Sequence, residues 1–142
     1  MLRGEFESAG ESSPAQLRSA YDDRLVATVE DVGHSTVVTE ANVEEVTVEA
    51  LLDGQSPELS VETATAILAT DPDRPDAETL RMEARDILLM GMSMAVLDVE
   101  AIASGIDDQL EPKEIQQKVE GRHPMTLDEY ALLHSYIEGE KR

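Results

Sequence analysis

The sequence predicts an all-α protein: a compact bundle of about eight helices, arranged as two similar repeats around a central long helix. Two observations carry this prediction. Apolar residues recur at helical spacing through most of the chain, and capping residues precede the main apolar runs. The β-branched run at residues 36–39 is too short and too isolated to pair as a strand. With 142 residues, the chain is long enough for one ordinary domain, or for two small halves that share a core.

The first half opens on a strong helix-start signal. Ser13 is a suitable N-cap, Pro14 fits the first helical position, and Gln16 completes a capping box. Apolar residues then follow at helical spacing until Gly33, which is expected to end the helix. Three shorter helices are expected after it, at residues 35–41, 45–53 and 60–69.

The chain is expected to divide into four parts. Residues 1–11 mix glycine, serine and glutamate around Phe6, and this composition predicts a disordered N-terminus. A first repeat then covers residues 12–70, a linker covers residues 71–76, and a second repeat covers residues 77–142. The two repeats are expected to share one core.

Two prolines mark the linker, because neither Pro72 nor Pro75 can continue a helix. The aspartates around them suggest a calcium loop, but an EF-hand loop needs an oxygen ligand at its fifth position and a glycine at its sixth. Pro75 and Asp76 stand at these positions. The segment is therefore interpreted as a solvated linker, with Asp76 as the N-cap of the next helix.

A long helix is expected from Ala77 to about Leu97. Its second half, Ile87–Leu97, carries no charged residue and is therefore predicted to be buried. Met90, Met92 and Met94 give this half a flexible, polarisable surface. The methionines are interpreted as core or as the interface of a homodimer, in preference to a peptide-binding groove.

The second half repeats a spacing found in the first. Gly54 precedes Pro57 by three residues, and Gly121 precedes Pro124 by three residues. A helix precedes each glycine, and the second of these helices is expected to begin at Pro112. A capped helix follows each proline, with Ser60 as the first cap and Thr126 as the second. A shared supersecondary unit explains this correspondence.

The segment from Val37 to Pro57, with Asn42 at its turn, resembles the helix-turn-helix of lambda-repressor-like domains. Asn tolerates the left-handed backbone that a turn glycine supplies in that family. The second copy keeps a turn glycine, Gly105, and carries about four extra residues before its helix. The whole chain also resembles an uncharacterised family of small acidic haloarchaeal proteins. These resemblances imply a compact helical bundle, and DNA binding by a transcriptional regulator as one function.

Only one of the two helix-turn-helix-like segments has a charge that suits DNA. Glu44, Glu45, Glu49 and Asp53 give residues 44–55 a charge of −4, whereas residues 112–123 sum to +1. Basic side chains bind phosphate and glutamine can pair with adenine. The candidate DNA-binding residues are therefore Lys113, Gln116, Gln117, Lys118 and Arg122. The alternative is a non-catalytic protein-interaction or structural module that makes no contact with DNA.

The sequence contains no pattern that predicts catalysis, a cofactor or a metal site. The three histidines, His34, His123 and His134, are not paired at helical spacing, and no phosphate-binding loop or nucleophile elbow is found. The absence of cysteine excludes a disulfide framework and a cysteine-based zinc site. We therefore expect a protein that is not an enzyme, with no evident small-molecule ligand.

Negative charge dominates the composition, with 11 basic against 31 acidic residues and a net charge of −20. The carboxylates are spread over every expected helix, which is typical of proteins adapted to molar salt. No apolar run reaches the roughly 18 residues that a membrane-spanning helix needs. The sequence thus predicts a halophilic, haloarchaeal protein in the cytoplasm, with no membrane partner.

Overall fold

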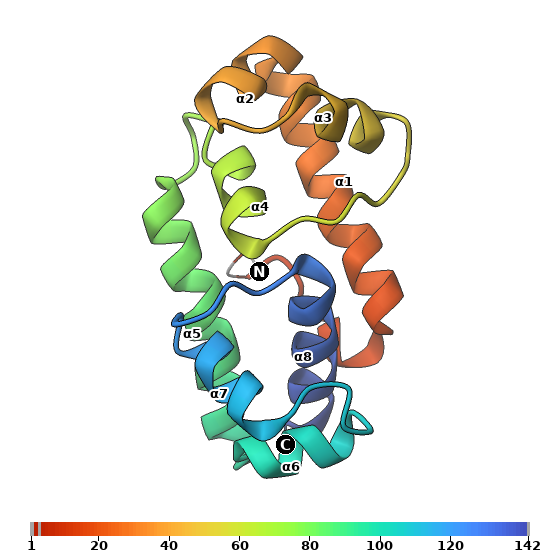
Figure 1. Ribbon diagram of the computed structural model, residues 1–142, viewed down its shortest axis with the longest axis vertical. Coiled ribbons are helices and arrows are strands. Elements are labelled where there is room, and N and C mark those ends of the chain that lie inside the picture. Colours follow the sequence, from red (N-terminus) through yellow and green to blue (C-terminus); the bar gives the residue numbers. More distant parts are fainter. Residues whose placement is uncertain (1, 3, 142) are drawn as a thin grey trace.

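The computed structural model describes residues 2 and 4–141, and Figure 1 shows their arrangement. The part that it describes is helical, which confirms the all-α bundle of about eight helices. The helices are η1 (Ala9–Glu11, a short 3₁₀ helix), α1 (Pro14–Val32), α2 (His34–Glu40), α3 (Glu45–Leu52), α4 (Val61–Leu68), α5 (Ala77–Ala95), α6 (Val99–Gly105), α7 (Pro112–Val119) and α8 (Leu127–Glu140).

The capping signals in the sequence start the helices where they were expected. Ser13 and Gln16 form a capping box before α1, and Thr126 and Glu129 form another before α8. The Ser60 side chain accepts the backbone N–H of Thr63 at the start of α4. At the start of α5, Asp76 accepts the N–H of Thr79 at 2.9 Å. Each cap supplies an acceptor to a helix N–H that has no partner within the helix.

Residues 14–140 form two four-helix units with similar helix lengths. Helices α1, α2 and α3 contain 19, 7 and 8 residues, and α5, α6 and α7 contain 19, 7 and 8 residues. Left-handed backbone recurs at corresponding points, in the pairs Gly33 and Val96, Asn42 and Asp107, and Gly54 and Gly121. Because these angles are uncommon outside glycine, their recurrence in the same order indicates a duplicated unit.

The two units pack against each other with approximate two-fold symmetry. Helix α1 packs on α4 and α8, and α5 likewise packs on α8 and α4 (Figure 1). The residues before α4 and α8 form an antiparallel bridge, in which Val61 N–H donates to the Met125 carbonyl at 2.8 Å and Leu127 N–H to the Leu59 carbonyl at 2.7 Å. One buried apolar cluster runs through both units. The expected long helix is therefore one of two, and each flanks the central pair α4 and α8.

The expectation of a disordered N-terminus is wrong for residues 2 and 4–11. Leu2 is only 4% exposed, and Ala9 is also buried. The ring of Phe6 packs edge-on against Tyr21 in α1 at a centroid distance of 4.9 Å. Helix η1 lies against α8, where Gly10 closely approaches the backbone of Glu138. These contacts bury enough apolar surface to offset the ordering entropy, which the composition of the segment did not reveal.

The expectation that Ile87–Leu97 is buried throughout is also wrong. Leu88 and Gly91 face the core, but Met90 is 60% exposed, and Met94 and Val96 are exposed as well. The run is apolar on both faces, yet α5 lies at the side of the bundle and can bury only one of them. The homodimer through the Met90–Met94 region remains a prediction.

The turn of the second unit lies two residues beyond the expected glycine. Asp107, with a φ of 57°, corresponds to Asn42, with a φ of 52°. Gly105 instead lies in α6, where an added Cβ would meet the ring of Tyr136 at 2.1 Å. That glycine therefore permits close packing of α6 on α8 and is not the residue that turns the chain.

Along the described chain, no single helix is both long enough and apolar enough to cross a membrane. Helices α5 and α6 together have the length and composition for a crossing, but a bend of 92° separates them.

Candidate functional site

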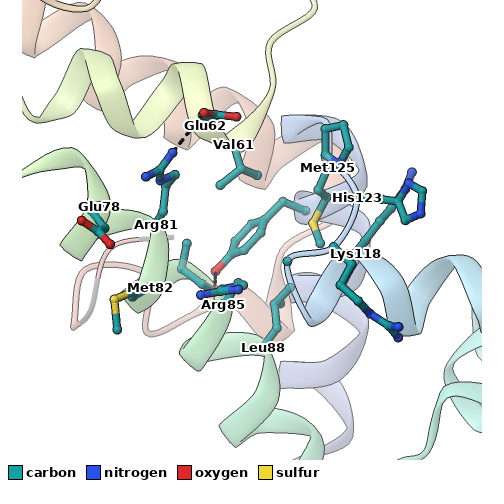
Figure 2. A pocket seen from close by; sticks show the side chains of 15 residues that line it. Val61, Glu62, Glu78, Arg81, Met82, Arg85, Leu88, Lys118, His123 and Met125 are labelled. Atoms are coloured by element: carbon teal, nitrogen blue, oxygen red, sulfur yellow. Dashed lines mark hydrogen bonds and ion pairs between the residues drawn. The ribbon is translucent and has the colours of Figure 1, made fainter.

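A pocket of about 460 Å³ opens where α5 and the loop after α7, from the second unit, meet the start of α4 from the first unit. Its floor is apolar and its rim carries most of the charge (Figure 2). The lining residues are Val61, Glu62, Glu78, Arg81, Met82, Ala84, Arg85, Leu88, Lys118, Gly121, Arg122, His123, Pro124, Met125 and Tyr130. We call this cavity the α5 pocket.

Four of the eleven basic residues of the chain line the α5 pocket. This is a marked concentration in a protein with a net charge of −20. Arg81 and Arg85 reach in from α5, and Lys118 lies on the opposite side, near the end of α7 (Figure 2). Arg122 completes the set from the loop after α7. The lining carries these four basic side chains against two acidic ones, Glu62 and Glu78, and this balance favours an anionic ligand.

Three of these four cations have a carboxylate partner. Arg81 pairs with Glu62 at 3.0 Å, and Arg122 pairs with Glu120. Lys118 pairs with Glu129, and the Lys118 side chain is only 15% exposed because it occupies the position of the buried Leu51 in the first unit. Burial acts to raise the pKa of Glu129, but the hydrogen bonds from Lys118 and from the Thr126 backbone outweigh it and hold that pKa below its usual value.

Arg85 differs from the other three. Its Nη1 donates to the backbone carbonyl of Glu120 at 3.1 Å, and no carboxylate of a described residue lies within ion-pairing distance. Gly121 makes this position possible, because an added Cβ there would meet Arg85 Nη1 at 1.9 Å. A guanidinium has five N–H donors, so several remain to be directed at a ligand.

The floor of the pocket is built from α5 and α8. Ala84 and Leu88 from α5 are buried there, beside Met125 and Tyr130. The Tyr130 hydroxyl donates to the Ala84 carbonyl at 2.7 Å, so its polar end is satisfied within the protein. Burial raises the pKa of Tyr130 well above its usual value, which keeps the hydroxyl protonated. The floor thus offers apolar surface to a ligand.

The corresponding place in the first unit is closed. When α1 and α5 are aligned from their first residues, Arg18 corresponds to Arg81 and Asp22 to Arg85. Arg18 is 5% exposed, and it donates to Asp22 at 3.0 Å, to Asp128 at 2.9 Å and to the Pro57 carbonyl. Ser56 donates to the second oxygen of Asp22. Arg18 and Asp22, both buried and both with charged or hydrogen-bonded partners, thus fill the space in the first unit that corresponds to the α5 pocket.

The candidate DNA-binding residues do not form one exposed basic face. Lys118 and Arg122 are paired with glutamates and line the α5 pocket, and Gln116 donates to Glu120 at 3.2 Å. Gln117 is half-buried. Of the five candidates, only Lys113 is an exposed cation with no carboxylate partner among the described residues.

Arg81 and Arg85, the two α5 cations of the pocket, are not among the residues that the sequence patterns singled out. The repeat recognised in the sequence extends back to the turns at Asn42 and Gly105 and stops short of the helices that became α1 and α5. The signal was present, because Leu17, Tyr21 and Leu25 have the same spacing as Leu80, Ala84 and Leu88. An alignment on these residues sets Asp22 against Arg85.

A second cluster combines one histidine with two carboxylates in the first unit. The ligand atoms of His34, Glu45 and Glu49 lie within 4.8 Å of one another. His34 Nε2 is buried without a hydrogen-bond partner, but the ring is partly exposed and both glutamates face solvent. No sequence pattern predicts that these three side chains meet, because His34 begins one helix and the glutamates lie on the next.

Comparison with known proteins identifies a family. A family model described as "Family of unknown function (DUF5791)" matches residues 17–140, which include all of the two four-helix units except the first three residues of α1, and all of the α5 pocket. No curated protein and no solved structure matches the chain. The expected resemblance to an uncharacterised family is confirmed at that level, whereas its haloarchaeal origin and its helix-turn-helix character remain predictions. The chain, a tandem of two four-helix units with one of two equivalent places open, belongs to the family of unknown function DUF5791.

Proposed function

We propose that this protein is a non-catalytic protein-interaction module, and that a partner inserts a side chain or chain end into the α5 pocket. One observation carries the proposal: the same place in a duplicated unit is sealed by Arg18 in the first copy and open in the second. A volume of about 460 Å³ lies in the range of ligand-binding pockets. An apolar floor with polar groups at the rim is also the usual composition of a recognition site.

The chemistry of the lining groups favours binding over catalysis. Tyr130 is held in its protonated form and is bonded to a backbone carbonyl. Arg81, Lys118 and Arg122 are neutralised by glutamates, and a guanidinium does not act as a base at neutral pH.

The proposal is tested by blocking the mouth of the pocket. Met82 lies at the rim and is half-exposed, so Met82→Trp adds bulk there at little cost to the core. Met90→Trp is the matched control, because Met90 is similarly exposed on the same helix and lies outside this pocket. The partner is captured from a high-salt lysate of the source organism, identified by mass spectrometry, purified, and titrated by calorimetry.

We expect the purified partner to bind the parent and Met90→Trp alike, and to bind Met82→Trp at least about tenfold more weakly, which corresponds to 1.4 kcal/mol. Equal binding to all three proteins overturns the proposal. Loss with Met90→Trp alone assigns the interaction to the exposed methionine face of α5.

DNA binding remains the alternative, and the geometry changes how it must be tested. Reversing Lys118 would set a carboxylate against Glu129 in a half-buried place, so loss of binding could come from loss of the fold. Lys113→Glu is the cleaner variant, because Lys113 is exposed. A regulator should bind genomic duplex better than random duplex at matched KCl, and Lys113→Glu should weaken that binding.

A further inference from the structure

The two units of the chain differ at one charged position, and this difference decides whether the positive charge beside the α5 pocket has a carboxylate partner on the same helix. In the first unit, Arg18 and Asp22 stand one turn apart on α1 and form an ion pair at 3.0 Å. In the second unit, the corresponding residues are Arg81 and Arg85. The arginine is kept, and its carboxylate partner on the same helix is replaced by a second cation.

The other ion-pair partner of each arginine is a carboxylate in both units. Arg18 pairs with Asp128 at the start of α8, and Arg81 pairs with Glu62 at the corresponding place in α4. What the second unit lacks is therefore one carboxylate, the equivalent of Asp22. It also carries the uncompensated charge of Arg85, whose contact in the described chain is a backbone carbonyl.

The surroundings define what this missing carboxylate would be attached to. The apolar part of the lining consists of Ala84, Leu88, Met125 and Tyr130, together with Val61. Figure 2 shows Val61, Leu88 and Met125 around the pocket. Apolar surface of this kind favours an apolar body over a strongly hydrated one such as a free inorganic ion. Figure 2 places Glu78 at the edge of the pocket away from His123 and Lys118.

We propose that the α5 pocket binds a carboxylate carried on an apolar body, held by Arg81 and Arg85 much as Asp22 is held by Arg18. This inference rests on the proposed function, since it assumes that the pocket is a binding site, and it adds the chemical class of the group bound. The carboxylate belongs either to a free organic acid or to an acidic residue or chain end of the protein partner. Both sources present the same group to the arginines.

The binding test uses phenylacetate and its neutral isostere phenylacetamide as probes. Each is titrated into the full chain at one fixed KCl concentration, the lowest that gives full helicity, and followed by two-dimensional NMR of the backbone amides. Phenylacetate should shift the amides of Arg81, Arg85 and Gly121 and should bind at least about tenfold more tightly than phenylacetamide. Equal affinity for the two probes, when both bind, overturns the inference, and so does binding of neither probe nor of the Leu-Glu-Leu peptide described below.

Arg85→Asp restores in the second unit the pair found in the first. The new carboxylate should pair with Arg81 and occupy the place of the ligand, so phenylacetate binding should fall at least about tenfold while helicity is retained. Lys113→Asp makes the same change in net charge at an exposed position outside the pocket and should bind phenylacetate as the parent does. Glu78→Gln removes a nearby negative charge and should strengthen binding. If Arg85→Asp binds as well as the parent does, the inference fails.

A pair of glycine variants tests Arg85 without changing any charge. Gly121 and Gly54 have φ values of +77° and +80°, so an alanine at either position carries the same backbone strain. Only at Gly121 does the added Cβ collide with Arg85, because nothing lies within 4 Å of the corresponding atom at Gly54. Gly121→Ala should therefore displace the Arg85 guanidinium and weaken phenylacetate binding, and Gly54→Ala should keep that binding at similar stability. Equal affinity in both variants counts against a role for Arg85.

Further arms separate this inference from the function on which it rests. A capped Leu-Glu-Leu peptide that binds in the same place while phenylacetate does not assigns the carboxylate to a protein partner. Phenylphosphonate binding more tightly than phenylacetate overturns the assignment of a carboxylate. If the partner is captured in a manner that Met82→Trp abolishes and Arg85→Asp does not affect, the inference falls and the interaction module stands. If phenylacetate binds and no partner is captured, the carboxylate site stands and the interaction module falls.

Discussion

His134 is a titratable residue in the core, and its surroundings fix its protonation state. The Tyr21 hydroxyl lies 2.6 Å from His134 Nδ1, and Tyr130 packs against the same ring. Burial lowers the pKa of His134 from 6.5 to about 3. Burial also raises the pKa of Tyr21, so that its hydroxyl stays protonated. Tyr21 therefore donates the hydrogen bond and neutral His134 accepts it at Nδ1.

This arrangement predicts a loss of stability in mild acid. In the unfolded chain His134 takes up a proton as the pH falls through 6.5, whereas the folded chain resists until about pH 3. Between these values the unfolded state binds more protons, so the free energy of unfolding should fall with decreasing pH by about 1.4 kcal/mol per pH unit for this residue. Urea melts at a series of pH values measure it.

Protonation of the many carboxylates acts in the opposite direction by relieving repulsion, so the measurement needs a control. His134→Leu copies Leu68, which is buried at the corresponding position in the first unit. As the pH falls below 6.5, the parent should lose free energy of unfolding relative to this variant, because only the parent has the histidine. A difference that is constant with pH would mean that His134 titrates in the fold as it does in the unfolded chain.

At the scale of the elements, the N-terminal segment is the clearest case in which packing overrides composition. Phe6 contacts Tyr21, and the Arg24 guanidinium lies 5.4 Å from the centre of its ring. Glu5 adds ion pairs to Arg24 and Arg74. The segment thus ties α1 to the loop before α5 and completes the core of the molecule at that end.

The Phe6 contacts predict a measurable contribution to stability. Phe6→Ala should lower the free energy of unfolding by about 1–2 kcal/mol, less than for a fully buried phenylalanine because Phe6 is only half-buried. Ser8→Ala is the control, since the Ser8 side chain makes no capping hydrogen bond in the same segment. Thermal or urea melts compare the three proteins. A loss no larger than that of the control would show that the segment does not dock in solution.

The helices themselves were largely predictable, because their signals are local. The capping boxes at Ser13 and Thr126 and the stop at Gly33 lie within a few residues of the structures that they specify. Helix α6 was not delimited in advance, although Asp98 caps it by accepting the N–H of Ala101 at 2.8 Å. The apolar run continues through Val96 up to Asp98, so hydropathy does not mark the turn. The chain turns at Val96 with a positive φ, where a glycine would have been the usual signal.

For the whole molecule, the charge predicts a dependence on salt. A net charge of −20 on a small bundle repels itself, and molar salt reduces the screening length to roughly 3 Å. Helicity and thermal stability should therefore rise as KCl approaches molar concentrations, as circular dichroism would record. Sucrose at matched osmolality is the control, because it does not screen charge. Full and unchanged helicity at millimolar KCl would contradict the prediction.

The sequence by itself determined the fold class, the main helix starts and the presence of a repeat, because periodicity and capping are written in neighbouring residues. The tertiary structure alone decided which cations are free. The sequence alone suggests that Lys118 is a surface lysine, but the structure places it at the position of the buried Leu51, where it pairs with Glu129. Arg85 is one of many charged residues in the sequence, and its importance becomes visible only when α1 and α5 are aligned, because Asp22 then occupies the corresponding position. Charged groups neutralise one another across residues that are distant in the chain. Only the packed structure therefore distinguishes the filled space around Arg18 from the open α5 pocket.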